Sequence, residues 1–584
     1  MWRSRVFAWP SSTRRVGDAL VLLGAALVAL FYLNRVFTPW PLYAGDEGAY
    51  LIRALYGDLL AAHPERHPTV HPVGNTVYVL LIQLVDALSA NVLPWLRLIG
   101  LSAYVGGLIL LHRALSAVQT RNVAVWGLAA ALAYPFHRFV VTAMPEGLFV
   151  LVLAVIVAAS ARWALTRPWM LAGASGGLCA ALVLIKPHGV VIMPAMGLLL
   201  LAMVALGQRR IWSALGQGAL FAGVFLLTGA AIQLLTGRGE AAFTFFLGAA
   251  YADHFARVPP EPLRTAAVTV LSLGSATLLM AGAPLLAGAR AVAGRWRRRE
   301  APAPDEVAFL VLAAALAATL AMIVLFAVKV SAIEGESDRL WGRYFEFYTP
   351  LLWIAAAGSV HALWREGGVA ARLWLAALPA AGFAGLLLAW TLGVTILPWD
   401  SAALSAFYIP HLDTWAFAAP LPYAGISAGV VVLLCLALIR GAPPARVWAS
   451  ALVAFGLVST HYDHTWVSTG VAAHRAALEK DLVVAAALAP PEDLPVLIAF
   501  DHNASHKAFL AYGGKVQIHV RPLGPIPATL LDGASQVAII GGEPPPDPWR
   551  ATYSGEALIL YSPGLTPAAP LAEGQSETMP ESLP

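Results

Sequence analysis

The sequence predicts a mainly α-helical protein, a polytopic membrane helix bundle followed by a small C-terminal α/β domain. Of its 584 residues, 59% are hydrophobic and only 12% are charged, whereas roughly a quarter of the residues are charged in a typical soluble protein. The mean hydropathy of +0.71 is too high for these side chains to be hidden in one core. Lipid is therefore the expected solvent for most of the surface. Beyond residue 460 the long apolar runs give way to short ones, which indicates a second domain.

A spanning helix needs about 20 apolar residues, and about thirteen segments meet that criterion. The predicted spans are 16–37, 92–116, 123–137, 144–165, 169–186, 189–206, 212–236, 265–288, 306–330, 345–364, 371–397, 422–440 and 447–460. Residues 72–90 form a further apolar run, which Gly74, Asn75, Gln83 and Asp86 interrupt. We expect an interfacial helix there, within a first external loop at 38–91.

Charge in the loops orients these spans. The loops assigned to the cytoplasm are all basic, whereas acidic residues gather in the opposite loops, as the positive-inside rule requires. The basic loops include Arg113, Arg121, Arg162, Arg167, Arg209 and Arg210. The N-terminus is therefore predicted to be cytoplasmic and the C-terminal domain extracytoplasmic. The first apolar segment lacks a small-residue cleavage site, so it is interpreted as a retained helix.

Composition also bears on the location and the partners of the protein. The abundance of Ala, Arg and Gly suggests a bacterium of high genomic GC content, hence a multi-pass protein of the bacterial inner (plasma) membrane with a periplasmic C-terminal domain. Membrane lipids are expected partners, whereas the scattered basic residues give no support for nucleic-acid binding. Cys179 and Cys435 both lie in apolar segments, so neither a disulfide framework nor a metal-type cysteine spacing is present.

The predicted domains are a membrane domain at 1–460, an α/β domain at 461–562 and a disordered tail at 563–584. In the α/β domain, helical stretches are expected at 470–489 and 505–512. Short apolar runs separated by Gly, Pro and Asn are typical of strands, and four of them occur, at Leu494–Phe500, Lys515–Val520, Gln536–Ile540 and Ala557–Tyr561. The tail is rich in Pro, Ala, Glu and Ser, a composition typical of disorder.

The first candidate site is the pair Asp46-Glu47, which follows the first span. Tyr50, Leu51, Ala54 and Leu55 then recur at helical spacing, so the pair is predicted at a helix start, where the dipole favours an ionised carboxylate. An acidic helix cap without chemistry is the alternative interpretation.

The same external loop contains a histidine-rich stretch between His63 and Pro72. Three histidines and Glu65 lie within nine residues and form a candidate for binding a divalent metal ion or a phosphate. His67 and His71 are the site candidates here. No fixed ligand spacing supports a metal, so no cofactor is certain, and a polar, proline-broken loop is the alternative.

Further ionisable residues lie at the predicted outer ends of the spans, where such side chains are costly and are often functional. Glu146 follows Pro145 at the start of the fourth span, and Arg138 lies just before it. Lys186 begins the Lys-Pro-His-Gly turn after the fifth span, where it either reaches lipid headgroups or binds phosphate. Arg343 and Tyr344 lie before the tenth span. A surface pair between Arg343 and Glu346 is the alternative for that arginine.

Together these motifs resemble the C-type (GT-C) glycosyltransferases that use polyprenyl-phosphate sugars. The shared features are an Asp-Glu motif after the first span, a Pro-Glu start to the fourth, a Lys-Pro turn after the fifth and a Gly-Arg-Tyr opening to a late span. An external C-terminal domain completes the layout. Lipid A aminoarabinose transferases and protein O-mannosyltransferases are the most similar members, and the resemblance covers roughly residues 16–460.

The resemblance implies roles for these residues. Asp46 would be the catalytic carboxylate and Glu47 its supporting partner, Glu146 would be a further acidic site group, and Lys186 and Arg343 would hold the donor phosphate. Tyr344 belongs to the same motif. Where the aminoarabinose transferases have a Glu-Lys-Pro-Pro stretch, this chain has His67-Pro-Thr-Val-His71-Pro, so His71 would replace the missing lysine.

The implied activity is transfer of a sugar, as in mannosyltransferases, from a polyprenyl-phosphate donor to a lipid, glycan or protein acceptor on the outer membrane face. A carboxylate would deprotonate the acceptor hydroxyl, and cations would stabilise the leaving phosphate. A multi-pass transporter or lipid flippase is the alternative, although no inverted repeat is evident and the polar residues gather at one face instead of the midplane. A non-catalytic scaffold is a third hypothesis.

Overall fold

The computed structural model describes residues 11–37, 45–68, 70, 75–89, 91–246, 261–332, 338–397, 399–406, 421–489, 495–499, 502–521, 525–531, 534–540 and 544–563. Of the predicted features, His71, the first ten residues and the tail beyond Pro563 lie outside this set. The chain forms two compact units, which are described separately below. The membrane unit comprises Met1–Val36, Leu98–Val141 and Pro145–Trp466, and the α/β unit comprises Phe37–Arg97, Thr142–Met144 and Val467–Pro584.

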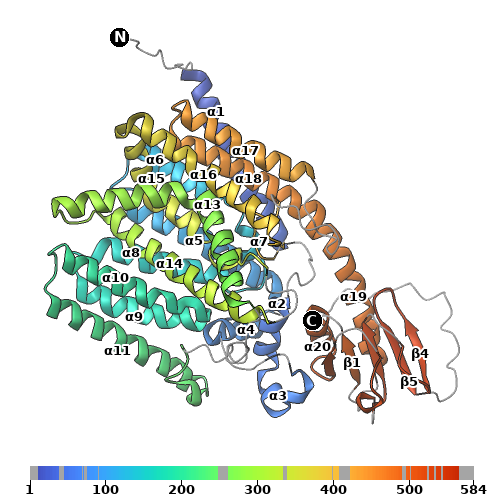
Figure 1. Ribbon diagram of the computed structural model, residues 1–584. Coiled ribbons are helices and arrows are strands. Elements are labelled where there is room, and N and C mark those ends of the chain that lie inside the picture. Colours follow the sequence, from blue (N-terminus) through green and yellow to red (C-terminus); the bar gives the residue numbers. More distant parts are fainter. Residues whose placement is uncertain are drawn as a thin grey trace. The chain divides into compact units, whose positions relative to one another are not determined.

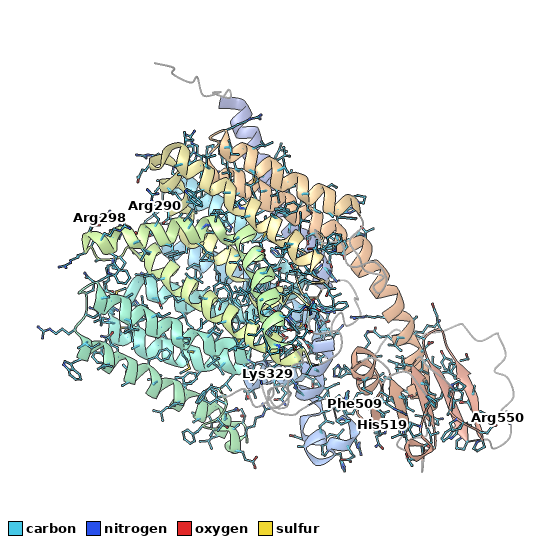
Figure 2. All side chains as sticks on the ribbon, viewed as in Figure 1. Arg290, Arg298, Lys329, Phe509, His519 and Arg550 are labelled. Carbon is cyan, nitrogen blue, oxygen red and sulfur yellow. The ribbon has the colours of Figure 1, made fainter. Side chains whose placement is uncertain are left out.

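The membrane unit is a bundle of long apolar helices (Figure 1). In chain order its helices are α1 (Ser11–Phe37), α5 (Val92–Leu115), α6 (Arg121–Ala133), α7 (His137–Val140), α8 (Glu146–Trp163), α9 (Pro168–Ile185), α10 (Ile192–Ala205), α11 (Ile211–Leu235), α13 (Pro262–Arg298), α14 (Pro304–Val330), α15 (Tyr348–Glu366), α16 (Gly368–Thr391), α17 (Leu421–Ile439) and α18 (Pro444–Tyr462). Helices α13 and α14 run in opposite directions, so Arg298 at the end of α13 and Lys329 near the end of α14 lie at opposite ends of this unit (Figure 2).

Each predicted span corresponds to a helix, but not every one of these helices is long and apolar enough to cross a membrane. Ten helices of the described residues are long and apolar enough to cross a membrane, and α6, α15 and α18 are not among them. At a rise of about 1.5 Å per residue, the 13 residues of α6 extend only about 20 Å, less than a hydrocarbon core of about 30 Å. The prediction of an integral membrane helix bundle is confirmed, while the count of thirteen spans stays a prediction.

The α/β unit contains a five-stranded mixed sheet in the order β2-β1-β3-β5-β4. Strands β1 (Val496–Ala499), β2 (Gln517–Val520) and β3 (Val537–Ile540) are parallel, and β5 (Ile559–Pro563) runs antiparallel to β3 and to β4 (Trp549–Ser554). The four predicted strands are β1, β2, β3 and β5. Sequence reasoning missed β4, whose side chains are mostly exposed. The predicted tail starts one residue early, because Pro563 belongs to β5.

The helices of the first external loop pack into this same unit. They are α2 (Gly45–Leu55), α3 (Gly57–Ala62), η1 (Pro64–Arg66) and α4 (Thr76–Leu88), and the domain adds α19 (Thr469–Leu488) and α20 (His502–Ala511). Ile52 of α2 and Leu60 of α3 share one buried core with Leu482, Leu497 and Phe509. The first external loop and the C-terminal domain, which are distant in the chain, thus belong to one unit.

The predicted helices of this loop are present, with shifted details. Helix α4 is apolar but only 13 residues long, in keeping with the interfacial helix predicted at 72–90. Tyr50, Leu51 and Ala54 are buried on α2 as predicted, whereas Leu55 is 37% exposed and Ile52 is fully buried. The buried face of α2 is therefore rotated towards Ile52.

Candidate functional site

Glu146 is the first residue of α8 and lies where α8 meets α5. Pro145 is the residue that caps this helix, so the fixed φ of proline precedes the turn that carries the carboxylate. The backbone of Gly147 lies directly against Gly100 of α5, where any side chain would collide with the Gly100 carbonyl. This close approach buries the Glu146 side chain to 3% exposure.

Lys186 completes a buried ion pair with this glutamate. It ends α9, and Pro187 follows it, so the helix cannot continue in its regular form. The Lys186 Nζ donates to Glu146 Oε1 at 2.6 Å, and the lysine side chain is only 5% exposed. The ammonium also lies over the ring of Tyr344, 5.0 Å from its centroid. The predicted turn residue is therefore a buried cation facing a carboxylate and an aromatic ring.

Arg343 brings a second cation to the same carboxylate. Its Nε lies 3.5 Å from Glu146 Oε1, and its side chain is 11% exposed. It occupies the 3-10 turn η5 (Gly342–Tyr344), which precedes α15 as the sequence predicted. Its backbone N–H donates to the Asp400 carbonyl at 2.5 Å. A Cβ on Gly342 would lie 2.8 Å from that carbonyl oxygen, so glycine is needed for this approach.

Glu146, Lys186, Arg343 and Tyr344, here called the Glu146 cluster, therefore meet in the membrane unit although they come from three separate parts of the chain. Two cations, an ammonium and a guanidinium, therefore lie beside the Glu146 carboxylate. Guanidinium and ammonium groups are the side chains that proteins use to bind phosphate. Lys186 and Arg343 therefore have the chemistry to bind an anion such as a phosphate group.

Arg138, a further site candidate from the sequence, belongs to a different group of charges. Its side chain is fully buried, its Nη2 donates to the Ser401 carbonyl at 2.5 Å, and its Nη1 lies 3.8 Å from Asp463 Oδ1. Arg35 of α1 pairs with the other Asp463 oxygen. Glu346 accepts hydrogen bonds from Ser401 Oγ and from the Ala402 N–H. We call Arg35, Arg138, Glu346, Ser401 and Asp463 the Asp463 network.

Sequence reasoning did not assign Arg35, Asp463 or Glu346 to this network. A signal for Arg35 existed, since it is a charge near the end of a predicted span, where ionisable residues face the bundle interior or pair with each other. Its partner Asp463 lies 428 residues further along the chain. Spacing within the sequence could not have indicated that pairing.

In the α/β unit, Asp46 and Glu47 occupy the first turn of α2, as predicted. The Glu47 side chain is completely buried, its Oε1 accepts a hydrogen bond from the Ala143 N–H at 2.7 Å, and Arg97 Nη2 lies 3.9 Å away. Asp46 is partly exposed. Since neighbouring residues of a helix point about 100° apart, only Glu47 enters this anchored position. These contacts make Glu47 a residue that fixes the α2 helix.

The histidine-rich stretch also packs within the α/β unit. The His67 ring is buried, stacks on His506 at 5.1 Å and lies 5.2 Å from the ring of Phe509. Next to His506, Lys507 pairs with Glu479. Burial lowers the pKa of the Lys507 ammonium, while the negative charges of Glu479 and Glu47 act in the opposite direction.

The metal prediction is not decided by these contacts. Within the described residues, no group of three His, Cys, Asp or Glu side chains is arranged to hold a metal ion. His63 instead lies 3.2 Å from Glu65 in an exposed pair, and His71 falls outside the described ranges. A metal ion in this loop stays a prediction.

Two solved structures are similar to the chain over nearly its whole length. The crystal structure of ArnT from Cupriavidus metallidurans bound to undecaprenyl phosphate gives a TM-score of 0.54 at 14% identity, covering 94% of this chain and 99% of that one. The apo state of ArnT gives a TM-score of 0.51 at 15% identity, with 95% and 100% covered. The chain has the fold of ArnT. The predicted resemblance in fold is thereby confirmed. No protein-family model and no curated protein sequence matches the chain.

Proposed function

We propose that this protein is a GT-C-type glycosyltransferase that takes a sugar from a polyprenyl-phosphate donor at the outer face of a bacterial inner membrane. The observation that carries the proposal is the Glu146 cluster, in which Lys186 and Arg343 lie beside the same carboxylate. The ArnT structure bound to undecaprenyl phosphate has the same fold, which supports a phosphate on a lipid as the anion.

The proposed glycosyl transfer uses the charges of the Glu146 cluster. The acceptor hydroxyl oxygen forms a bond to the anomeric carbon of the sugar, and the bond from that carbon to the phosphate oxygen breaks. The leaving phosphate keeps the electron pair, stays attached to its lipid and gains negative charge. Lys186 and Arg343 stabilise that charge by ion pairing and hydrogen bonding, which is the largest contribution that a preorganised site makes to catalysis. Glu146 holds both cations in place before the donor binds.

A base must take the proton of the acceptor hydroxyl, and we assign this role to Asp46. It follows the first span on the predicted outer face, is partly exposed and lies at a helix N-terminus, where the dipole stabilises the ionised carboxylate. Glu47 is the weaker choice for a base, because it is fully buried and already accepts the Ala143 N–H. The acceptor is a lipid, a glycan or a protein at the same face.

The proposal is tested with the full-length protein in nanodiscs. Lys186→Ala and Arg343→Ala are each expected to weaken the binding of undecaprenyl phosphate about tenfold or more, because each removes a hydrogen bond to a charged group. Transfer from a radiolabelled undecaprenyl-phosphate hexose to an envelope fraction should fall by roughly 10²–10³-fold. Lys329→Ala, which changes a lysine at the end of α14 (Figure 2), is the matched control and should change neither quantity.

The Asp46→Asn variant tests the proposed base independently of the phosphate site. This variant is expected to bind undecaprenyl phosphate normally while losing transfer by roughly 10²–10⁴-fold, the range for removal of a general base. Normal transfer by Asp46→Asn would remove Asp46 from the mechanism. Normal lipid-phosphate binding by both the Lys186 and Arg343 variants would overturn the proposed donor site.

A further inference from the structure

Helices α5 and α8 of the membrane unit run in the same direction and separate towards their ends. Gly100 lies directly against Gly147, and a Cβ on Gly107 would lie 3.1 Å from the Leu151 Cα. The backbones therefore touch along the earlier part of each helix. Further along, where α5 ends at Leu115 and α8 ends at Trp163, a groove of about 520 Å³ opens between them.

The walls of this groove are almost entirely apolar. Gly106 and Ile109 contribute from α5, and Ala158 and Trp163 from α8. Both helices are candidate membrane spans, so these walls are expected to face hydrocarbon. The position of Gly106 is open, since a Cβ built there meets no atom within 4 Å. The groove has the volume and the apolar lining to accept part of an acyl chain.

Two arginines lie at the end of the groove. Arg113 lies in the last turn of α5 and Arg162 in the last turn of α8, and both line the groove. Both side chains are exposed, and among the described residues no carboxylate forms an ion pair with either. A cation in the last turn of a helix complements the dipole. The helix dipole explains why an arginine lies at each helix end. It does not explain why both arginines line the same apolar groove.

We propose that this groove binds an anionic phospholipid, with the lipid phosphate between Arg113 and Arg162 and one acyl chain along Gly106 and Ala158. Basic pockets between membrane helices on the cytoplasmic side are suited to anionic headgroups, and the charge distribution predicts that α5 and α8 end on that side. The Glu146 cluster and the α2 helix contribute no residue to the groove. The inference therefore does not depend on the proposed glycosyltransferase activity.

Native mass spectrometry of the full-length protein tests this site. The protein is released from nanodiscs that contain equal amounts of phosphatidylglycerol and phosphatidylcholine, and the retained lipid is counted. Gly106→Leu fills the groove without altering either arginine. Its control is Gly173→Leu in α9, where an added Cβ also meets nothing within 4 Å. Arg113→Gln and Arg162→Gln remove the charges, and their control is Arg290→Gln in α13, an exposed arginine labelled in Figure 2.

We expect each arginine variant to retain about fivefold less phosphatidylglycerol than the wild type, the effect of removing one basic residue near anionic headgroups. Gly106→Leu should lose the same adduct, while both controls keep it and phosphatidylcholine adducts stay unchanged. Equal losses in Arg290→Gln would mean general attraction to the membrane and would overturn the site. The proposal that the groove holds an acyl chain would also be overturned if Gly106→Leu retained phosphatidylglycerol. The same would follow if millimolar inorganic phosphate displaced phosphatidylglycerol from the wild type.

Discussion

The Glu146 cluster and the Asp463 network are both buried groups of charged side chains in the membrane unit, and both join distant parts of the chain. They differ in how their charges are balanced. In the network, Arg35 and Arg138 face Asp463 and Glu346, and the chain itself supplies Ser401 and Ala402 as hydrogen-bond partners. In the cluster, Lys186 and Arg343 both pair with Glu146.

This difference separates a structural role from a binding role. Breaking a buried ion pair leaves an uncompensated charge inside the protein, so the network is expected to stabilise the fold. The cluster, in which two cations lie beside the same carboxylate, is expected to gain stability when an anion enters. The same chemical change is therefore expected to affect folding in the network and ligand binding in the cluster.

The largest effect is expected at Asp463. Asp463→Ala leaves Arg35 and Arg138, with side chains 6% and 0% exposed, without their shared carboxylate. Breaking such a pair costs roughly 3–5 kcal/mol, so the variant should unfold at a markedly lower temperature in detergent and yield less monodisperse protein. Asp58→Ala, an exposed aspartate of α3, should change stability by less than about 0.5 kcal/mol. A stable Asp463→Ala variant that binds undecaprenyl phosphate poorly would instead make the network part of the ligand site.

A glutamate-to-glutamine change in each group compares them directly. Glu346→Gln places an amide NH₂ against Ser401 Oγ–H or the Ala402 N–H, both of which are donors to Glu346. Glu146→Gln leaves Lys186 and Arg343 without their carboxylate. Each change should cost the ligand-free protein about 1–3 kcal/mol, the usual penalty for an unsatisfied buried polar group.

Ligand should distinguish the two variants. Undecaprenyl phosphate is expected to restore the stability of Glu146→Gln, because the phosphate replaces the missing carboxylate between Lys186 and Arg343. It should give Glu346→Gln only the wild-type shift. The measurement is the difference in unfolding temperature with and without undecaprenyl phosphate. Equal shifts in both variants would contradict the separation of the two roles.

How far the sequence predicts this molecule depends on the range of the interactions involved. Long apolar runs specify spanning helices locally, so the bundle was predictable, whereas α6 with 13 residues was not resolvable as a span by length alone. Strand β4 was missed because its exposed, polar side chains resemble those of a loop. It pairs at the edge of the sheet with β5, and that partner is what makes it a strand.

The same distinction applies to the site. Glu146, Lys186 and Arg343 were predictable as candidates because ionisable side chains at the ends of apolar segments are costly. Their mutual contacts were not, since they come from α8, the end of α9 and η5. Glu47 could not be distinguished from its neighbour Asp46 by sequence, because both carry the same charge. The burial of Glu47 against Ala143 and Arg97 depends on packing that no local pattern encodes.

The smallest effect concerns the aromatic ring beside each group. Lys186 lies over the ring of Tyr344 at 5.0 Å, and Arg138 lies over the ring of Phe139 at 5.5 Å. A cation–π contact contributes about 0.5–2 kcal/mol. Tyr344→Leu should therefore weaken undecaprenyl phosphate binding about fivefold, because Lys186 loses a contact that orients it, whereas Tyr344→Phe keeps the ring and should bind nearly as the wild type.

Phe139→Leu is the matched change in the network. Arg138 remains held by Ser401, Ser405 and Asp463, so donor affinity should not change, although unfolding should become somewhat easier because the Phe139 side chain is buried. Isothermal titration with undecaprenyl phosphate measures the affinities, and thermal unfolding measures the stabilities. If Phe139→Leu weakened binding as much as Tyr344→Leu, the aromatic contact would act through the general packing of the bundle and not through the cation that it orients.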